Sequence, residues 1–82
     1  MENVEETLKK ETEKWLERLE GKMNSIKPLE NKARWAIENL KAYIQDCRYF
    51  QDKKDFVRAF EAVVYAYGIY ETAVQSGLIG EI

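Results

Sequence analysis

The chain contains no histidine, and it has only one cysteine and one proline among its 82 residues. Without histidine it lacks the commonest general base and the commonest metal ligand, so we expect no catalytic residue and no metal site. A single cysteine cannot form an internal disulfide, which predicts a reducing, cytoplasmic location. The four glycines are scattered and form no phosphate-binding loop, so no cofactor is expected. The protein is therefore predicted not to be an enzyme.

Long apolar runs and an excess of one charge are also missing. No stretch is apolar enough to span a bilayer, and no basic-then-apolar leader opens the chain, so no membrane partner is expected. The 13 Lys and Arg residues nearly balance the 15 Asp and Glu residues, giving a net charge of −2. Such a chain has no general field to attract nucleic acid, which is therefore not an expected partner unless the contact is local.

Hydrophobic residues make up 45% of the chain and charged residues 34%, the balance of a folded helical protein. The length allows one domain, spanning residues 1–82. In the first part, apolar residues recur at steps of three, four or seven, as on one stripe of a helix. They are Val4, Leu8, Trp15, Leu19, Met23 and Ile26. This spacing predicts a helix over about 3–26 that continues through Gly21 and stops before Pro28.

Pro28 suits a first helical turn, so a second helix is predicted over about 28–52. Its seam follows the same three-four spacing: Leu29, Ala33, Ile37 or Ala36, Leu40, Ile44, Cys47 and Gln51. Beside the seam runs an unusual second row of aromatic and polar residues: Trp35, Asn39, Tyr43, Asp46 and Phe50. Cys47 lies on the seam, where a small buried hydrophobe fits better than a nucleophile.

A third helix is predicted over about 55–76. Asp55 is a suitable N-cap, and Gly77 can take the left-handed conformation of a helix end with Leu78 folding back. Residues 78–82 then form a short loose tail. Because the implied loops are short, consecutive helices should be antiparallel. The expected fold is all-α, an antiparallel up-down-up three-helix bundle.

The third helix is far more apolar than the first, with only Arg58, Glu61 and Glu71 charged between residues 57 and 76. Apolar residues nearly all round a helix indicate either a central position or a contact outside the monomer. Small residues gather on one side and form the candidate interface: Ala59, Ala62, Ala66, Ile69 and Ala73. A homodimer through this side and a bundle that uses both sides internally are both consistent with the pattern.

The segments from Tyr43 to Phe50 and from Ala59 to Gly68 resemble a family of short archaeal proteins, the domain of unknown function 357. The shared features are a tyrosine, an aspartate and an aromatic pair on the second helix, then an Ala-Phe pair and a Tyr-Ala-x-Gly core on the third. Here these are Tyr43, Asp46, Tyr49, Phe50, Ala59, Phe60, Tyr65, Ala66 and Gly68. The resemblance implies a helical bundle in an archaeal cytoplasm and supplies no activity.

Two further groups are candidate sites. Tyr43, Asp46 and Tyr65 are predicted to form a polar cluster between the second and third helices, either to fix helix register or to bind a small ligand. Arg48, Lys53, Lys54 and Arg58 form a basic corner that is either solvated or contacts RNA. The leading hypothesis is a non-enzymatic interaction module that self-associates or docks a protein partner through the third helix; a small-ligand or RNA-binding bundle is the alternative.

Overall fold

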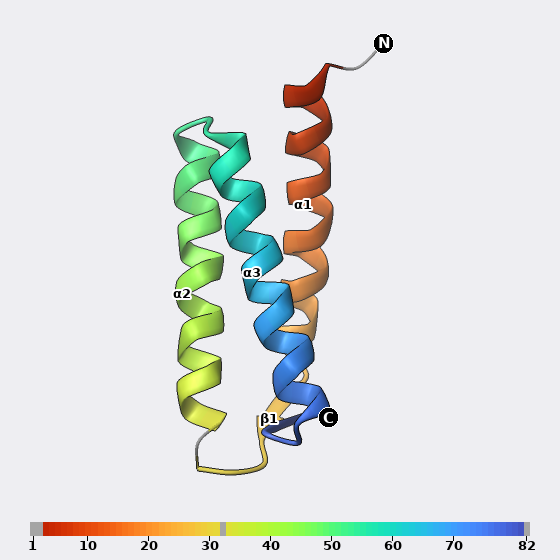
Figure 1. Ribbon diagram of the computed structural model, residues 1–82, viewed down its shortest axis with the longest axis vertical. Helices are drawn as coiled ribbons and strands as arrows, with labels where there is room; N and C mark the ends of the chain where they lie inside the picture. Colours follow the sequence, from red (N-terminus) through yellow and green to blue (C-terminus); the bar gives the residue numbers. More distant parts are fainter. Residues whose placement is uncertain (1–2, 32, 82) are drawn as a thin grey trace.

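The structure, a computed structural model, describes residues 3–31 and 33–81. In chain order its elements are α1 (Val4–Met23), β1 (Ile26–Pro28), α2 (Ala33–Asp52), α3 (Phe56–Gln75) and β2 (Ile79–Glu81). The three helices run up, down and up, and α3 lies between α1 and α2 (Figure 1). The predicted all-α three-helix bundle is thus confirmed. A short antiparallel ribbon of β1 and β2 joins the bundle at one end.

The α1 helix begins where Asn3 caps it, because the Asn3 side chain accepts a hydrogen bond from the Glu6 amide at 2.8 Å. It continues through Gly21, as predicted, and ends at Met23. The predicted end near Ile26 is too late, because Ile26 already belongs to β1.

The prediction that Pro28 opens the second helix is wrong, since α2 begins five residues later, at Ala33. Residues 26–28 instead pair with β2, with Ile26 opposite Glu81 and Pro28 opposite Ile79. The next amide, on Leu29, donates to the Leu78 carbonyl at 2.9 Å. Proline is tolerated at the edge of a short ribbon, where its missing amide proton leaves few ladder bonds unmade.

The predicted loose tail over residues 78–82 is also wrong for its described part, because residues 79–81 form β2 and Ile79 is only 1% exposed. Ile82 lies outside the described residues. Residues 79–81 can pair with β1 because the chain reverses direction at the end of α3. There Gly77 takes the predicted left-handed conformation, with φ of 78°. The Leu78 amide donates back to the Ala73 carbonyl at 2.9 Å, and the Gly77 amide donates to Val74 at 3.1 Å. This hydrogen-bonded reversal sends the chain back across the bundle end.

The connection between α2 and α3 is tight and doubly capped. Asp55 is the N-cap of α3, as predicted, with its Oδ1 atom accepting from the Arg58 amide at 3.2 Å. Its own amide donates to the Phe50 carbonyl at 2.9 Å, which closes the end of α2. In the loop between the two helices, Lys54 occupies the left-handed region of backbone conformation, with φ of 59°.

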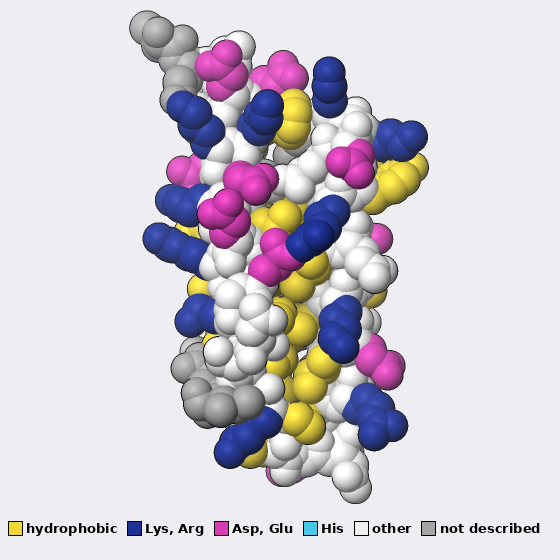
Figure 2. Space-filling model, turned by 180° about the vertical axis from the view of Figure 1, so that it is seen from behind, with side chains coloured by type: hydrophobic (Ala, Val, Ile, Leu, Met, Phe, Trp, Pro, Cys, Tyr) yellow, Lys and Arg dark blue, Asp and Glu magenta, His cyan; other side chains and the backbone are white. Residues whose placement is uncertain are grey.

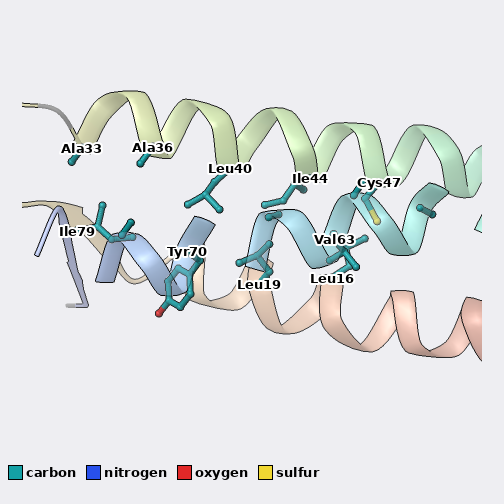
Figure 3. Packing of buried hydrophobic residues seen from close by; sticks show 14 residues of the cluster. Leu16, Leu19, Ala33, Ala36, Leu40, Ile44, Cys47, Val63, Tyr70 and Ile79 are labelled. Atoms are coloured by element: carbon teal, nitrogen blue, oxygen red, sulfur yellow. The ribbon is translucent and has the colours of Figure 1, made fainter. Parts of the chain in front are cut away.

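One apolar core runs the length of the bundle (Figure 3). It draws Leu16 and Leu19 from α1, Leu40 and Ile44 from α2, and Val63 from α3, all 9% exposed or less. Seen from behind, hydrophobic side chains follow a seam between charged ridges (Figure 2). Polar contacts cross from α1 to α2, where Gln51 Nε2 donates to Glu13 at 3.0 Å and Arg48 pairs with Glu20.

Candidate functional site

The alanine side of α3 is buried inside the monomer. Ala59 and Ala66 are fully buried, Ala62 is 7% exposed, Ala73 is 3% exposed, and Ile69 is half-buried. The candidate interface predicted on these five residues is therefore corrected: the side serves the bundle's own core. The physical reason is that small side chains let two helices approach closely, so α2 and α3 pack together with these residues between them.

A different face of α3 remains exposed. Val64 is 50% exposed and Tyr65 is 66% exposed, and on the adjoining helix Trp35 is 68% exposed. Together they border a groove of about 490 Å³ between α2 and α3. Its complete lining is Trp35, Ala36, Val64, Tyr65, Gly68, Ile69, Thr72, Ala73 and Leu78, referred to as the α2–α3 groove. The lining is almost entirely apolar.

The groove follows from the spacing of residues on two helices. Val64, Gly68 and Thr72 are four residues apart, so they lie on one ridge of α3 that faces away from the core. A Cβ atom added at Gly68 would meet no atom within 4 Å. The missing side chain therefore leaves space in the groove and does not avoid a clash inside the bundle. Trp35 adjoins Ala36, which is buried, and so stands at the border of the α2 core face.

The predicted polar cluster is only partly assembled. The rings of Tyr43 and Tyr65 stack with centroids 5.8 Å apart and an interplanar angle of 11°. Asp46 is exposed, and among the described residues it forms no hydrogen bond with either phenol. The predicted hydrogen bonds to the carboxylate are therefore wrong, because Asp46 keeps its charge in water instead of burying it against the rings. The two tyrosines join α2 to α3 at the groove border.

Three of the four cations of the basic corner have contacts within the bundle, although the side chains of Arg48 and Arg58 remain 58% and 67% exposed. Arg48 pairs with Glu20, and Arg58 lies 3.4 Å from Asp55. Lys53 lies over the Tyr49 ring at 5.6 Å. The corner thus does not gather its cations around one open site, and the RNA contact predicted there gains no support.

Cys47 is fully buried in the core. Burial, and secondarily the nearby charge of Glu13, raises the pKa of the Cys47 thiol to about 11. At neutral pH the group is a protonated, enclosed thiol with no nucleophilic character. Among the described residues, no group of three or more His, Cys, Asp or Glu side chains is placed to hold a metal ion.

Across residues 3–31 and 33–81, no helix is both long and apolar enough to cross a bilayer.

Sequence reasoning did not identify the α2–α3 groove. It noted the row that begins at Trp35, but it assigned the exposed side of α3 to the alanines. The one usable signal was Gly68, a helix-interior glycine amid bulky neighbours, which costs about 1 kcal/mol relative to alanine and indicates a surface where another group approaches closely.

The family prediction is confirmed. The chain belongs to the family described as protein of unknown function (DUF357), whose model matches residues 4–79. The structure is also similar to the crystal structure of protein AF1782 from Archaeoglobus fulgidus, of the same family, with a TM-score of 0.89 and 41% sequence identity. That match covers 98% of this chain and 100% of the other. No curated protein matches this chain. Because the family's description assigns no function, the function has to be inferred from the surface of the bundle.

Proposed function

We propose that this protein is a non-enzymatic helical interaction module in the cytoplasm of an archaeon, which self-associates or docks a protein partner through the α2–α3 groove. The observation that carries the proposal is the exposure of Trp35, Val64 and Tyr65 at 68%, 50% and 66% around one groove. Large apolar side chains that gather in water on a small domain are typical of a protein-binding surface. The docking helix is still α3, as expected from the sequence, but the contact lies at the groove and not on the alanine side.

The chemistry of the groove favours a protein over a polar small molecule. Polar atoms in the lining side chains are confined to Trp35, Tyr65 and Thr72, so few groups are available to orient a polar ligand. Tyrosine and tryptophan supply large contact area at low entropic cost, which makes them common anchors at protein interfaces. Gly68 leaves room for a partner's side chain or helix backbone to approach α3.

The non-enzymatic part of the proposal has separate support. The chain has no histidine, and its one cysteine is buried with a pKa raised to about 11. The described carboxylates form no cluster of the kind that holds a metal. No set of side chains around the groove pairs a nucleophile with a base.

Sedimentation equilibrium across a concentration series tests self-association. A dimer that dissociates on dilution is expected if the occupant is a second copy, and Val64→Arg should shift it fully to monomer. Val57→Arg is the matched control, because Val57 lies on the same helix, is 56% exposed and does not line the groove. Equal weakening by both variants would contradict the assignment of the groove.

If sedimentation equilibrium shows only monomer, the expected occupant of the groove is a different protein, and crosslinking tests for it. A photo-crosslinking amino acid at position 64 should then give one discrete adduct in native extract, identified by mass spectrometry, and the same probe at position 57 should not. Tyr65→Asp, introduced beside the position 64 probe, should abolish the adduct. A monomer that gives no position-specific adduct would overturn the proposed function.

A further inference from the structure

Many of the charges on α1 lie along two edges of the helix, although Glu11 lies among the cations and pairs with Lys14, and Lys9 lies over the Phe56 ring of α3. Lys10, Lys14, Arg18 and Lys22 recur every four residues and are called the basic ladder; Glu13, Glu17 and Glu20 follow one another at steps of four and three. Figure 2 shows Lys and Arg side chains in a row along the outer edge of α1, with acidic side chains nearer the seam.

Contacts with the other helices show which way each edge faces. On the acidic edge, Glu13 accepts from Gln51 and Glu20 pairs with Arg48, so this edge adjoins α2. On the basic edge, Lys22 lies 5.5 Å from the Tyr70 ring of α3. Lys22, the last residue of the basic ladder, therefore lies on the side of the bundle where α1 meets α3.

The ladder retains unneutralised charge. Within the described residues, neither Arg18 nor Lys22 forms an ion pair with a carboxylate. Lys14 pairs with Glu11 at 3.1 Å, yet its side chain is still 48% exposed. Steps of four residues place successive cations about 6 Å apart along the helix axis, each rotated by about 40° from the one before.

An aromatic cleft lies directly beside the ladder. Lys14 and Arg18 both lie over the Trp15 ring, at 5.5 and 5.0 Å, and Trp15 contacts Tyr67 of α3 edge to face at 5.2 Å. The two rings line a cleft of about 250 Å³, whose full lining is Trp15, Val63, Val64, Tyr67, Gly68 and Glu71. Glu71 is the sole charged member of that lining.

We propose that this side of the bundle binds single-stranded nucleic acid, with phosphates on the basic ladder and bases against Trp15 and Tyr67. Cations that follow a backbone, together with aromatic rings that accept bases, form the usual combination for single-strand binding without sequence preference. An acidic protein segment would neutralise the cations of the basic ladder but would leave the aromatic cleft empty. The contact is local, so it is compatible with a net charge of −2. The aromatic cleft shares Val64 and Gly68 with the α2–α3 groove, but Trp15 and the basic ladder lie outside the groove lining, so variants of the ladder test nucleic-acid binding separately from the proposed docking.

Fluorescence anisotropy with a labelled single-stranded RNA of about 12 nucleotides, within the usual site size, tests the proposal. Binding is expected at about 50 mM salt and should weaken steeply by about 200 mM. The Arg18→Glu/Lys22→Glu variant should bind at least tenfold more weakly, with a log-log salt slope smaller by about 1.4, because about 0.7 is lost per phosphate contact.

A matched control has the same net charge as the ladder variant. Lys53→Glu/Lys54→Glu makes the same charge change at the other end of the bundle and should leave affinity within about twofold, since its effect is only long-range and screened. Should the first double variant fail to fold by circular dichroism, Arg18→Gln/Lys22→Gln replaces it, with the same expected direction.

A second measurement reports on the bases. Trp35→Phe leaves Trp15 as the one tryptophan, and RNA should quench its fluorescence, whereas poly-glutamate should not. Absence of RNA binding at low salt, equal losses in the ladder and control variants, or displacement of RNA by poly-glutamate at equal charge would each overturn the proposal.

Discussion

The two apolar sides of α3 look alike in the sequence and have opposite fates in the fold. The alanine side, represented by Ala66 at 0% exposure, is enclosed by the bundle. The neighbouring ridge of Val64 and Tyr65 is at least half exposed. Val64 and Tyr65 thus remain in water although they are larger than the buried alanines, whereas Val63 and Tyr70 of the same helix are buried. The comparison teaches that closeness of helix approach, rather than hydrophobicity alone, selects the buried side of a short helix.

The largest effect should come from placing a charge on each side of α3. Ala66→Arg buries an unpaired cation in the core and should cost more than about 4 kcal/mol, which abolishes the folded bundle. Val64→Arg should change the free energy of unfolding by less than about 0.5 kcal/mol, because position 64 is in water. Urea unfolding followed by circular dichroism measures both. A folded Ala66→Arg protein would contradict the assignment of the alanine side to the core.

The next effect concerns what fills the space beside the small residues. In Figure 3, Ile79 lies at the end of the core occupied by Ala33 and Ala36, where it supplies the bulk that alanines lack. Ile79→Ala should therefore destabilise the protein by about 2–4 kcal/mol. The control is Val4→Ala, at a position 76% exposed, with an expected change within about 0.5 kcal/mol. Similar values for both would mean that β2 contributes nothing to the core.

A pH titration probes the α2 residues on the core side. The folded pKa of Cys47 is raised from 9.0 to about 11, so above pH 9 the unfolded thiol loses its proton before the folded one. Stability from this group is present below pH 9 and declines as pH rises to about 11, by at most about 2–3 kcal/mol. The free energy of unfolding of wild type should fall more steeply over this window than that of Cys47→Ala. Parallel curves for the two proteins would show that Cys47 is not desolvated.

The smallest effect is expected for a substitution on α1, the helix that completes the core opposite the exposed ridge of α3. Thr12 is fully buried, and its Oγ1 atom has no hydrogen-bond partner among the residues that the structure describes. Thr12→Val removes this hydroxyl at nearly constant volume and should stabilise the protein by about 1 kcal/mol. Thr7→Val is the matched control, because Thr7 Oγ1 donates to the Asn3 carbonyl at 3.1 Å in water and its loss should give no gain. Thermal unfolding distinguishes the two; a destabilised Thr12→Val protein would refute the argument.

Local signals in the sequence predicted the helices better than the connections between them. Asp55 and Gly77 each act through neighbouring backbone groups, and both form the caps expected of them. Pro28 was misassigned because its role depends on residues 79–81, about fifty positions away along the chain. Pairing at that separation leaves no periodic trace in so short a ribbon.

The candidate sites show the same division. Tyr43 and Tyr65 were correctly placed together across two helices, since both lie on faces that the three-four spacing defines. Asp46 was wrongly given a place between them, because spacing fixes the side of a helix and not whether a carboxylate leaves water. Trp35 stood in a recognised row but could not be assigned to a groove until α3 was in position.

By itself the sequence determined three antiparallel helices, the two caps of α3 and the predominance of apolar residues on that helix, because these depend on contacts within a few residues. It also determined the charge pattern of α1, with basic residues every fourth position. Only the tertiary structure decided that the alanines face inward, that Ile79 completes the core and that the basic ladder meets an aromatic cleft. Each of these depends on how closely two helices approach, a distance set by the fit of side chains from remote parts of the chain.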